Sequence, residues 1–290
     1  MTSEELLKRV RKIEIKTRRL SRNIFAGEYH SAFKGRGMSF AEVREYQIGD
    51  DVRDIDWNVT ARTNRPHIKV YEEERELTVM MLVDVSGSSK FGTEVRTGRE
   101  LLTEISATIA FSALQNNDKV GMILFSDKIE KYIPPKKGRK HILYIIRELL
   151  DFTPDHQQTN ISVGLEFLMQ VQRRHCIGFV LSDFIDSPDF ETQLSIATHK
   201  HDVVAVKVYD QRMKELPNIG LMNLQDSETG QTVIIDTSSK KVREMHKKWW
   251  DSEAEKHDRL FKKTKVDYVS ISTSEDYVKP LQTLFKNRHR

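Results

Sequence analysis

The stretch LTVMMLVDVSGSS, residues 77 to 89, decides the fold. Its first seven residues form a near-continuous apolar run, which is typical of a strand buried on both faces of a parallel sheet. The run ends at an acid, Asp84, and two hydroxyls follow at alternate positions, Ser86 and Ser88. A tight turn accounts for the glycine between the serines. It does not account for three side-chain oxygens at the end of a buried strand.

Strand-like and helical segments alternate along the rest of the chain. Strands are predicted at 119–125, 175–183, 202–210 and 266–274, with an antiparallel hairpin edge at 127–135. Helices are predicted at 94–116, 139–150, 161–173, 189–200, 240–263 and 277–288, and a hairpin at 219–236. This alternation predicts an α/β fold with a mostly parallel sheet and helices on both faces.

The first 76 residues have a different pattern. Residues 2–22 are predicted to form a basic helix, and SFAEVREYQ (39–47) a short one, whereas HIKVYEE (67–73) is strand-like. We therefore predict two domains. Residues 1–76 form a helix and a small charged module that packs on the second domain, residues 77–290, which carries a hairpin-helix insertion near 211–263.

The small module is too charged to make a good core alone, so its aromatic residues Phe40, Tyr46 and Trp57 are expected to pack on the larger domain, with the tryptophan shielded. Its acids in GDDVRDIDW (49–57) could form a second metal cluster, as in a nuclease. Ion pairs with the neighbouring arginines 44, 53 and 62 are the simpler interpretation.

Composition excludes several classes of function. The 290 residues hold 47 Lys and Arg against 43 Asp and Glu, a balance that gives no support to nucleic-acid binding. The longest apolar run is far shorter than the ~20 residues of a membrane helix. Because Cys176 is the single cysteine and the N-terminus lacks the apolar core of a signal peptide, we expect a cytoplasmic protein.

Polar side chains from three loops are expected at one edge of the sheet. Asp84 and Asp183 each end a predicted core strand, and ligands bind beyond the carboxyl ends of such strands. Thr159 lies in a polar loop just before a helix. With Ser86 and Ser88, these residues supply five oxygen ligands, which suit a hard cation such as Mg²⁺. We predict one Mg²⁺ or Mn²⁺ at this edge.

These motifs, in this order, resemble the metal-ion-dependent adhesion site of a von Willebrand factor A domain. The segment GEYHSAFKGRGMSFAEVREYQIGDDVRDIDWNVTAR (27–62) resembles the signature of the bacterial domain-of-unknown-function 58 family, whose members carry it directly before such a domain. The resemblance implies a Rossmann-like von Willebrand A fold and a working partnership with a MoxR-type AAA+ ATPase.

Two classes of function remain open. The first is a metal-dependent protein-binding adaptor, not an enzyme, in which a partner protein donates an acidic residue to the ion during assembly or maturation of a client. The second is a metal-dependent phosphoester hydrolase, which needs a general base or a second metal beside the first. The oligomeric state stays open.

Overall fold

The computed structural model describes residues 3–20, 39–72, 77–92, 96–185, 189–226 and 230–288. They form two compact units. The larger unit contains helix α1 (Ser3–Leu20) and the chain from residue 78 onward, and the smaller unit lies within residues 34–77. Within the described residues, no helix is long and apolar enough to cross a membrane.

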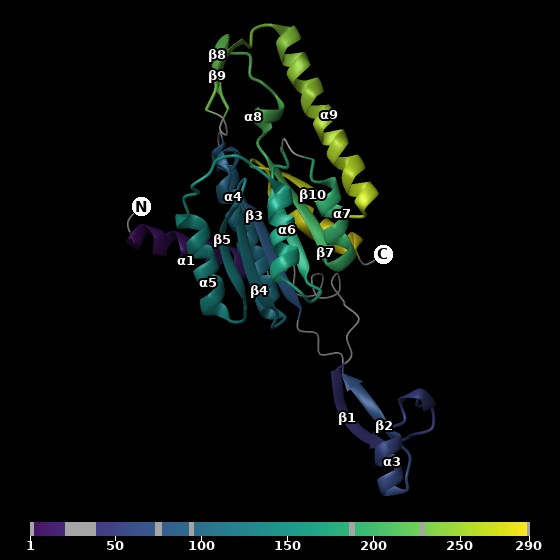
Figure 1. Ribbon diagram of the computed structural model, residues 1–290. Helices are drawn as coiled ribbons and strands as arrows, with labels where there is room; N and C mark the ends of the chain where they lie inside the picture. The colour runs from purple at the N-terminus through teal and green to yellow at the C-terminus, as the bar shows by residue number, and fades with distance from the viewer. Residues whose placement is uncertain are drawn as a thin grey trace. The chain divides into compact units, whose positions relative to one another are not determined.

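A six-stranded sheet is the centre of the larger unit (Figure 1). In spatial order its strands are β10 (Asp267–Ser272), β7 (Asp202–Tyr209), β6 (Ile177–Ser182), β3 (Thr78–Asp84), β4 (Lys119–Phe125) and β5 (Ile129–Lys136). The first five are parallel, and β5 runs antiparallel to β4. The predicted hairpin edge is therefore confirmed, and so is the predicted α/β fold with a mostly parallel sheet.

The edge strand β5 carries two consecutive prolines, Pro134 and Pro135. Proline lacks a backbone N–H, so it is tolerated at a sheet edge and not in the middle of a ladder. The pairing with β4 shifts register beside this pair, opposite Gly121. A Cβ at Gly121 would lie only 2.9 Å from the nitrogen of Pro135, so the close approach of the two strands requires glycine there.

Helices cover both faces of the sheet. One face carries α4 (Gly98–Gln115), on which α1 and α5 (Arg139–Asp151) pack. The other face carries α6 (Ile161–Val171), α7 (Glu191–Lys200) and the C-terminal end of α9 (Lys240–Thr264), which share one apolar core with alternate residues of the strands. The chain ends with α10 (Val278–Asn287), which packs beside β10.

The basic helix α1 is anchored by its own charges. Arg9 pairs with Glu100 at 2.9 Å and Lys16 with Glu104 at 2.7 Å, both on α4, while the buried acid Glu14 of α1 pairs with Arg139 of α5 at 2.6 Å. Part of the basic run that the sequence shows thus meets acids of the same chain.

A hairpin of β8 (Leu221–Gln225) and β9 (Thr232–Asp236) confirms the predicted one. It lies beyond the sheet, at the far end of the long helix α9 from α7 (Figure 1). The short helix α8 (Gln211–Lys214) leads into it from β7.

The smaller unit corrects one prediction. Residues 39–45 form a strand, β1 (Ser39–Glu45), and not a helix, because they pair antiparallel with β2 (His67–Glu72). Between them lie a 3-10 turn, η2 (Val52–Asp54), and the helix α3 (Trp57–Thr63).

The charges of this unit form local ion pairs. Arg44 makes two 2.8 Å bonds to Asp50, and Arg53 pairs with Asp51 at 2.9 Å. The ion-pair interpretation of these acids is therefore supported over a second metal cluster. Trp57 is 69% exposed within this unit, so its shielding by the larger unit stays a prediction.

Candidate metal site

The first candidate loop begins where β3 ends. Asp84 is only 2% exposed, and its two carboxylate oxygens are fixed from different directions. One accepts the backbone N–H of Ser86 at 2.9 Å, and the other accepts the hydroxyl of Ser182, the last residue of β6, at 2.6 Å. The hydroxyl oxygens of Ser86 and Ser88 lie 3.0 Å apart. The structure thus brings these three predicted residues together.

The second loop lies against the first. The N–H of Gly87 donates to the carbonyl of Gln157 at 2.8 Å, which holds the chain just before Thr159 next to the serines. Thr159 itself is buried, and the following residue, Asn160, caps α6 through its side chain. The cap fixes where the loop ends and the helix begins.

The third loop follows β6 and holds a bulky residue in an unusual backbone conformation. Asp183 accepts the N–H of Ile185 at 3.0 Å. Phe184 between them has φ of 58°, in the left-handed region that large side chains seldom adopt. Its buried ring packs on Phe190, and on Phe261 of α9 with ring centres 5.3 Å apart. Packing by α9 therefore holds the backbone next to Asp183.

The first and third loops line a small pocket at the carboxyl ends of the strands, whereas Ser86 and Thr159 are not among its lining residues. Asp84, Ser88 and Asp183 line it, together with Asp210 after β7 and Thr273 after β10. Its free volume is about 20 Å³, which is room for one water-sized occupant. The predicted acids from two strand ends thus do face one space.

Burial raises the pKa of the Asp84 carboxyl, although hydrogen bonds from Ser182 and Ser86 oppose the shift. No cationic side chain is among the described groups that shift it. Lys207 is a cation close enough to interact with Asp183, and it is 6% exposed. Burial lowers the pKa of Lys207, although the negative charge of Asp183 opposes the shift. A positive charge favours the ionised form of a buried carboxyl, so a bound cation would suit Asp84.

The donor chemistry of the five predicted residues fits Mg²⁺ or Mn²⁺. All are oxygen donors, two carboxylates and three hydroxyls, and hard divalent cations prefer such ligands. No three His, Cys, Asp or Glu side chains of the described residues converge as a metal site, so an ion here would depend on the hydroxyls. The ligand assignment itself stays a prediction.

Sequence reasoning missed three polar residues of this region: Ser182, Asp210 and Thr273. Ser182 bonds Asp84, and the Thr273 hydroxyl donates to Asp210 at 2.6 Å. Asp210 is the last residue of a predicted strand, and Ser182 and Thr273 are the next to last of theirs. Examining the carboxyl end of every predicted strand, as was done for Asp84, would have found them.

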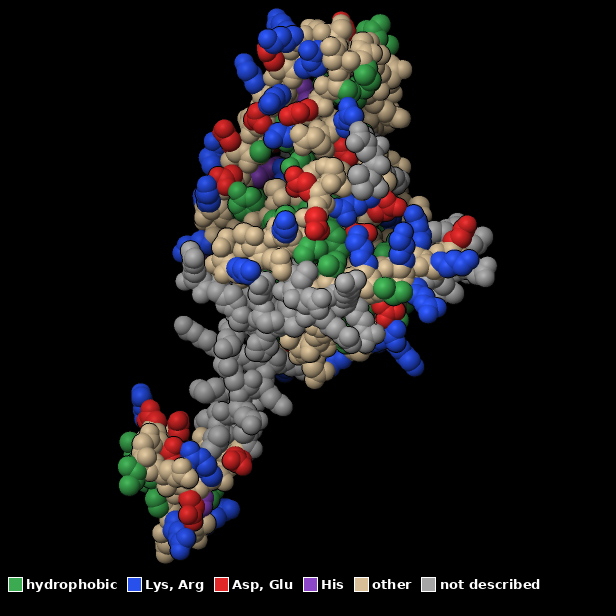
Figure 2. Space-filling model, turned by 180° about the vertical axis from the view of Figure 1, so that it is seen from behind, with side chains coloured by type: hydrophobic (Ala, Val, Ile, Leu, Met, Phe, Trp, Pro, Cys, Tyr) green, Lys and Arg blue, Asp and Glu red, His purple; other side chains and the backbone are tan. Residues whose placement is uncertain are grey.

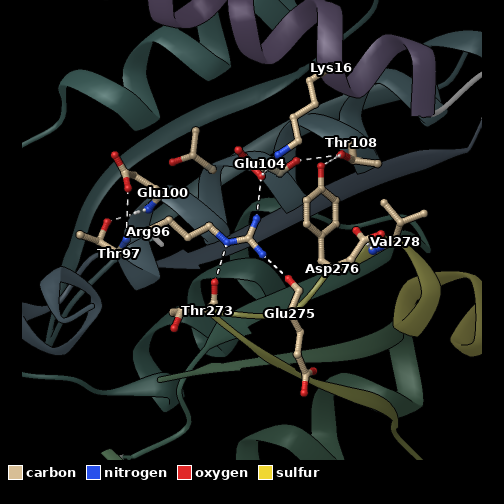
Figure 3. Close-up of polar contacts among 12 residues, drawn as sticks. Lys16, Arg96, Thr97, Glu100, Glu104, Thr108, Thr273, Glu275, Asp276 and Val278 are labelled. Atoms are coloured by element: carbon tan, nitrogen blue, oxygen red, sulfur yellow. Dashed lines mark hydrogen bonds and ion pairs between the residues drawn. The ribbon is translucent and has the colours of Figure 1, made fainter. Parts of the chain in front are cut away.

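An arginine before α4 holds the Thr273 loop in place (Figure 3). Arg96 donates to the carbonyls of Thr273 and Glu275 and pairs with Glu104 of α4 at 2.9 Å. Glu104 also receives Lys16 of α1. The network joins α1, α4 and the loop after β10 into one rigid support beside the pocket.

Comparison with known proteins yields relatives without an assigned function. The uncharacterized protein Rv1480 of Mycobacterium tuberculosis is 30% identical over 223 residues, which cover 76% of this chain and 70% of that protein.

Among solved structures, BatB from Bacteroides thetaiotaomicron matches with a TM-score of 0.50 and 16% identity, over 73% of this chain and 98% of that one. The VWA domain of SpRpn10 matches less closely, with a TM-score of 0.34 and 13% identity over 47% of this chain and 77% of that one. The family model described as "Protein of unknown function DUF58" matches residues 42–256, and the chain belongs to this family.

Proposed function

We propose that this protein is a metal-dependent protein-binding module and not an enzyme. One observation carries the proposal: Asp84, Ser88 and Asp183, from two strand ends, line one small pocket, and a backbone bond holds the Thr159 loop against the serines. Asp84, Ser86, Ser88, Thr159 and Asp183 would hold one Mg²⁺ or Mn²⁺. Five protein oxygens leave a sixth position of an octahedral shell to water.

The ion would supply a positive charge that a carboxylate of another protein can reach by displacing that water. The chain's own residues fix the loops. Ser182 and the N–H of Ser86 orient Asp84, while Phe184 and α9 hold the backbone of Asp183. Such a preorganised site favours recognition of an acidic side chain, because little ordering is left to be done on binding.

The partner we propose is a MoxR-type AAA+ ATPase, acting with this chain in the assembly or maturation of a protein client. This part rests on the family resemblance. The test is surface plasmon resonance against that ATPase, in Mg²⁺ and in EDTA, with wild type and Asp84→Asn. Binding should need both the metal and Asp84. Asp151→Asn, which changes an exposed acid at the end of α5, is the matched control. Equal binding in all conditions would place the interface elsewhere.

Metal binding is measured separately by calorimetry. Loss of a direct carboxylate ligand should weaken Mn²⁺ by about 100-fold or more, since even outer-shell changes cost about 10–100-fold. Asp84→Asn keeps the side-chain size, so its circular dichroism should match wild type. Wild-type Mn²⁺ affinity in the variant would contradict the ligand assignment.

A second candidate, the phosphoester hydrolase, is favoured by one observation. His156, three residues before Thr159, lies 2.9 Å from Asp127, and such a pair can accept a proton. A panel of phosphate esters with released phosphate as the readout separates the two functions. Turnover that disappears in His156→Gln and in EDTA would replace the adaptor with the hydrolase.

A further inference from the structure

The two outer edges of the central sheet differ in how they are protected. At one edge, β5 carries Pro134 and Pro135, which cannot donate to a further strand. At the other edge, β10 has the sequence DYVSIS, with neither proline nor lysine, and within the described residues it pairs only with β7. Asp267 and Ser270 on it are exposed, and Val269 is half-buried. An unprotected strand edge is a template for another strand.

A groove runs along this open edge. It lies between the C-terminal end of α9 and α10, with a volume of about 720 Å³, which is within the range of ligand-binding pockets. Its lining includes the buried apolar residues Phe261, Val266 and Leu284. Tyr268 and Val269 of β10 form the wall that offers backbone groups. A strand edge beside an apolar groove is how extended peptides are recognised by strand addition.

The lining is also positively charged. Lys262, Lys265 and Lys279 are exposed at the groove, against one acid, Asp267. Lys262 pairs with Asp258 and Asp267 with Arg288, whereas Lys265 and Lys279 have no acidic partner in the described part of the chain. The flank that carries α9 is rich in Lys and Arg (Figure 2). Two lysines without an acidic partner among the described residues, beside a strand edge, favour an acidic occupant.

Lys265 holds its place in a backbone conformation that usually belongs to glycine. It ends α9 in the left-handed region with φ of 55°, where glycine is the common residue. A lysine in this position costs roughly 1 kcal/mol relative to glycine. The cost is compatible with a role for its charge at the groove.

We propose that the β10 edge is a docking site for an extended, acidic peptide segment of a partner protein. The segment would add to β10 as a strand, with alternate apolar side chains toward Phe261 and Leu284 and acidic ones toward Lys265 and Lys279. A second copy of this chain is disfavoured, because symmetric pairing would bring the same lysines together. The site lies at the amino-terminal half of β10, so it is independent of the metal site at the carboxyl ends.

The probe is a fluorescein-labelled heptapeptide of alternating Glu and Val, with an alternating Lys and Val peptide as the opposite-charge probe. Fluorescence anisotropy on the full chain should show saturable binding of the acidic peptide only. Binding should weaken in high salt and stay unchanged in EDTA. The double variant Lys265→Glu and Lys279→Glu should lose about tenfold in affinity. Lys240→Glu with Lys248→Glu, at the other end of α9, makes the same charge change away from the groove and should bind as wild type.

Hydrogen exchange tells where the peptide lies. Amides of 267–272 should gain protection when the peptide is bound. If the charge reversal impairs folding, Lys265→Gly removes one charge at a position that accepts glycine, and a smaller loss of affinity is expected. The proposal would be overturned if the peptide bound without protecting the amides of β10, or if the two double variants bound it equally well. It would also be overturned if sedimentation showed the chain to be a dimer formed through this edge.

Discussion

A buried histidine makes the stability of the fold depend on pH. His201, directly after α7, is 2% exposed and lies with its Nδ1 3.4 Å from the sulfur of Cys176. Its Nε2 has no hydrogen-bond partner among the described residues. Burial, with smaller contributions from Lys200 and His175, lowers the pKa of His201 to about 4.

The sign of the effect follows from that lowered pKa. The unfolded chain binds a proton at His201 below about pH 6.5, whereas the folded chain stays neutral there until about pH 4. The contribution of neutral His201 to the free energy of unfolding is therefore fully present above the pKa of the unfolded chain, and it is lost as the pH falls toward the pKa of the folded chain. Between about pH 7.5 and about pH 4.5, linkage gives a loss of about 2.5 kcal/mol in the free energy of unfolding.

The perturbation is His201→Gln, which is neutral at every pH. Urea denaturation followed by circular dichroism gives the free energy of unfolding across the pH range. The wild type should lose about 2.5 kcal/mol more than the variant on acidification. His199→Gln, at an exposed site in the last turn of α7, is the control and should keep the wild-type slope. Parallel slopes for wild type and His201→Gln would refute the reasoning.

Three further outcomes are expected. Burial raises the pKa of the Cys176 thiol to about 12, so a thiol reagent at neutral pH should react only after urea unfolds the chain, and fast labelling of the native protein would contradict this. Arg96→Met should lower the free energy of unfolding by about 2 kcal/mol, because it leaves the carbonyls of Thr273 and Glu275 without this donor and Glu104 with Lys16 alone, as checked by urea titration. Phe184→Ala should cost about 3–5 kcal/mol and also weaken Mn²⁺ binding measured by calorimetry, whereas unchanged Mn²⁺ affinity would separate Phe184 from the position of Asp183.

The sequence predicts the sheet well because its strands are long apolar runs. β3, β4 and β6 are buried along nearly their whole length, and short apolar runs of this kind are typical of buried strands. Residues 39–45 are different. They have the spacing of a helix cap and also enough apolar residues for a strand, and their pairing with β2, distant in sequence, decides between the two.

The candidate site was predictable in part. Asp84 and Asp183 are visible in the sequence because each follows an apolar run. The bond from Ser182 to Asp84 is not visible, because it requires knowing that β6 lies next to β3. The left-handed conformation of Phe184 is equally hidden, since no residue type there suggests it and it depends on packing against Phe190 and against Phe261 of α9.

The prolines of β5 also limit how copies of this protein can associate. A sheet grows into a filament only when each added copy presents a second edge for the next one. Pro134 and Pro135 obstruct one of the two edges of this sheet, so two copies that met through β10 would leave only obstructed edges outward. Edge-to-edge association therefore ends at a pair, and the open edge can be used for recognition without a risk of open-ended polymerisation.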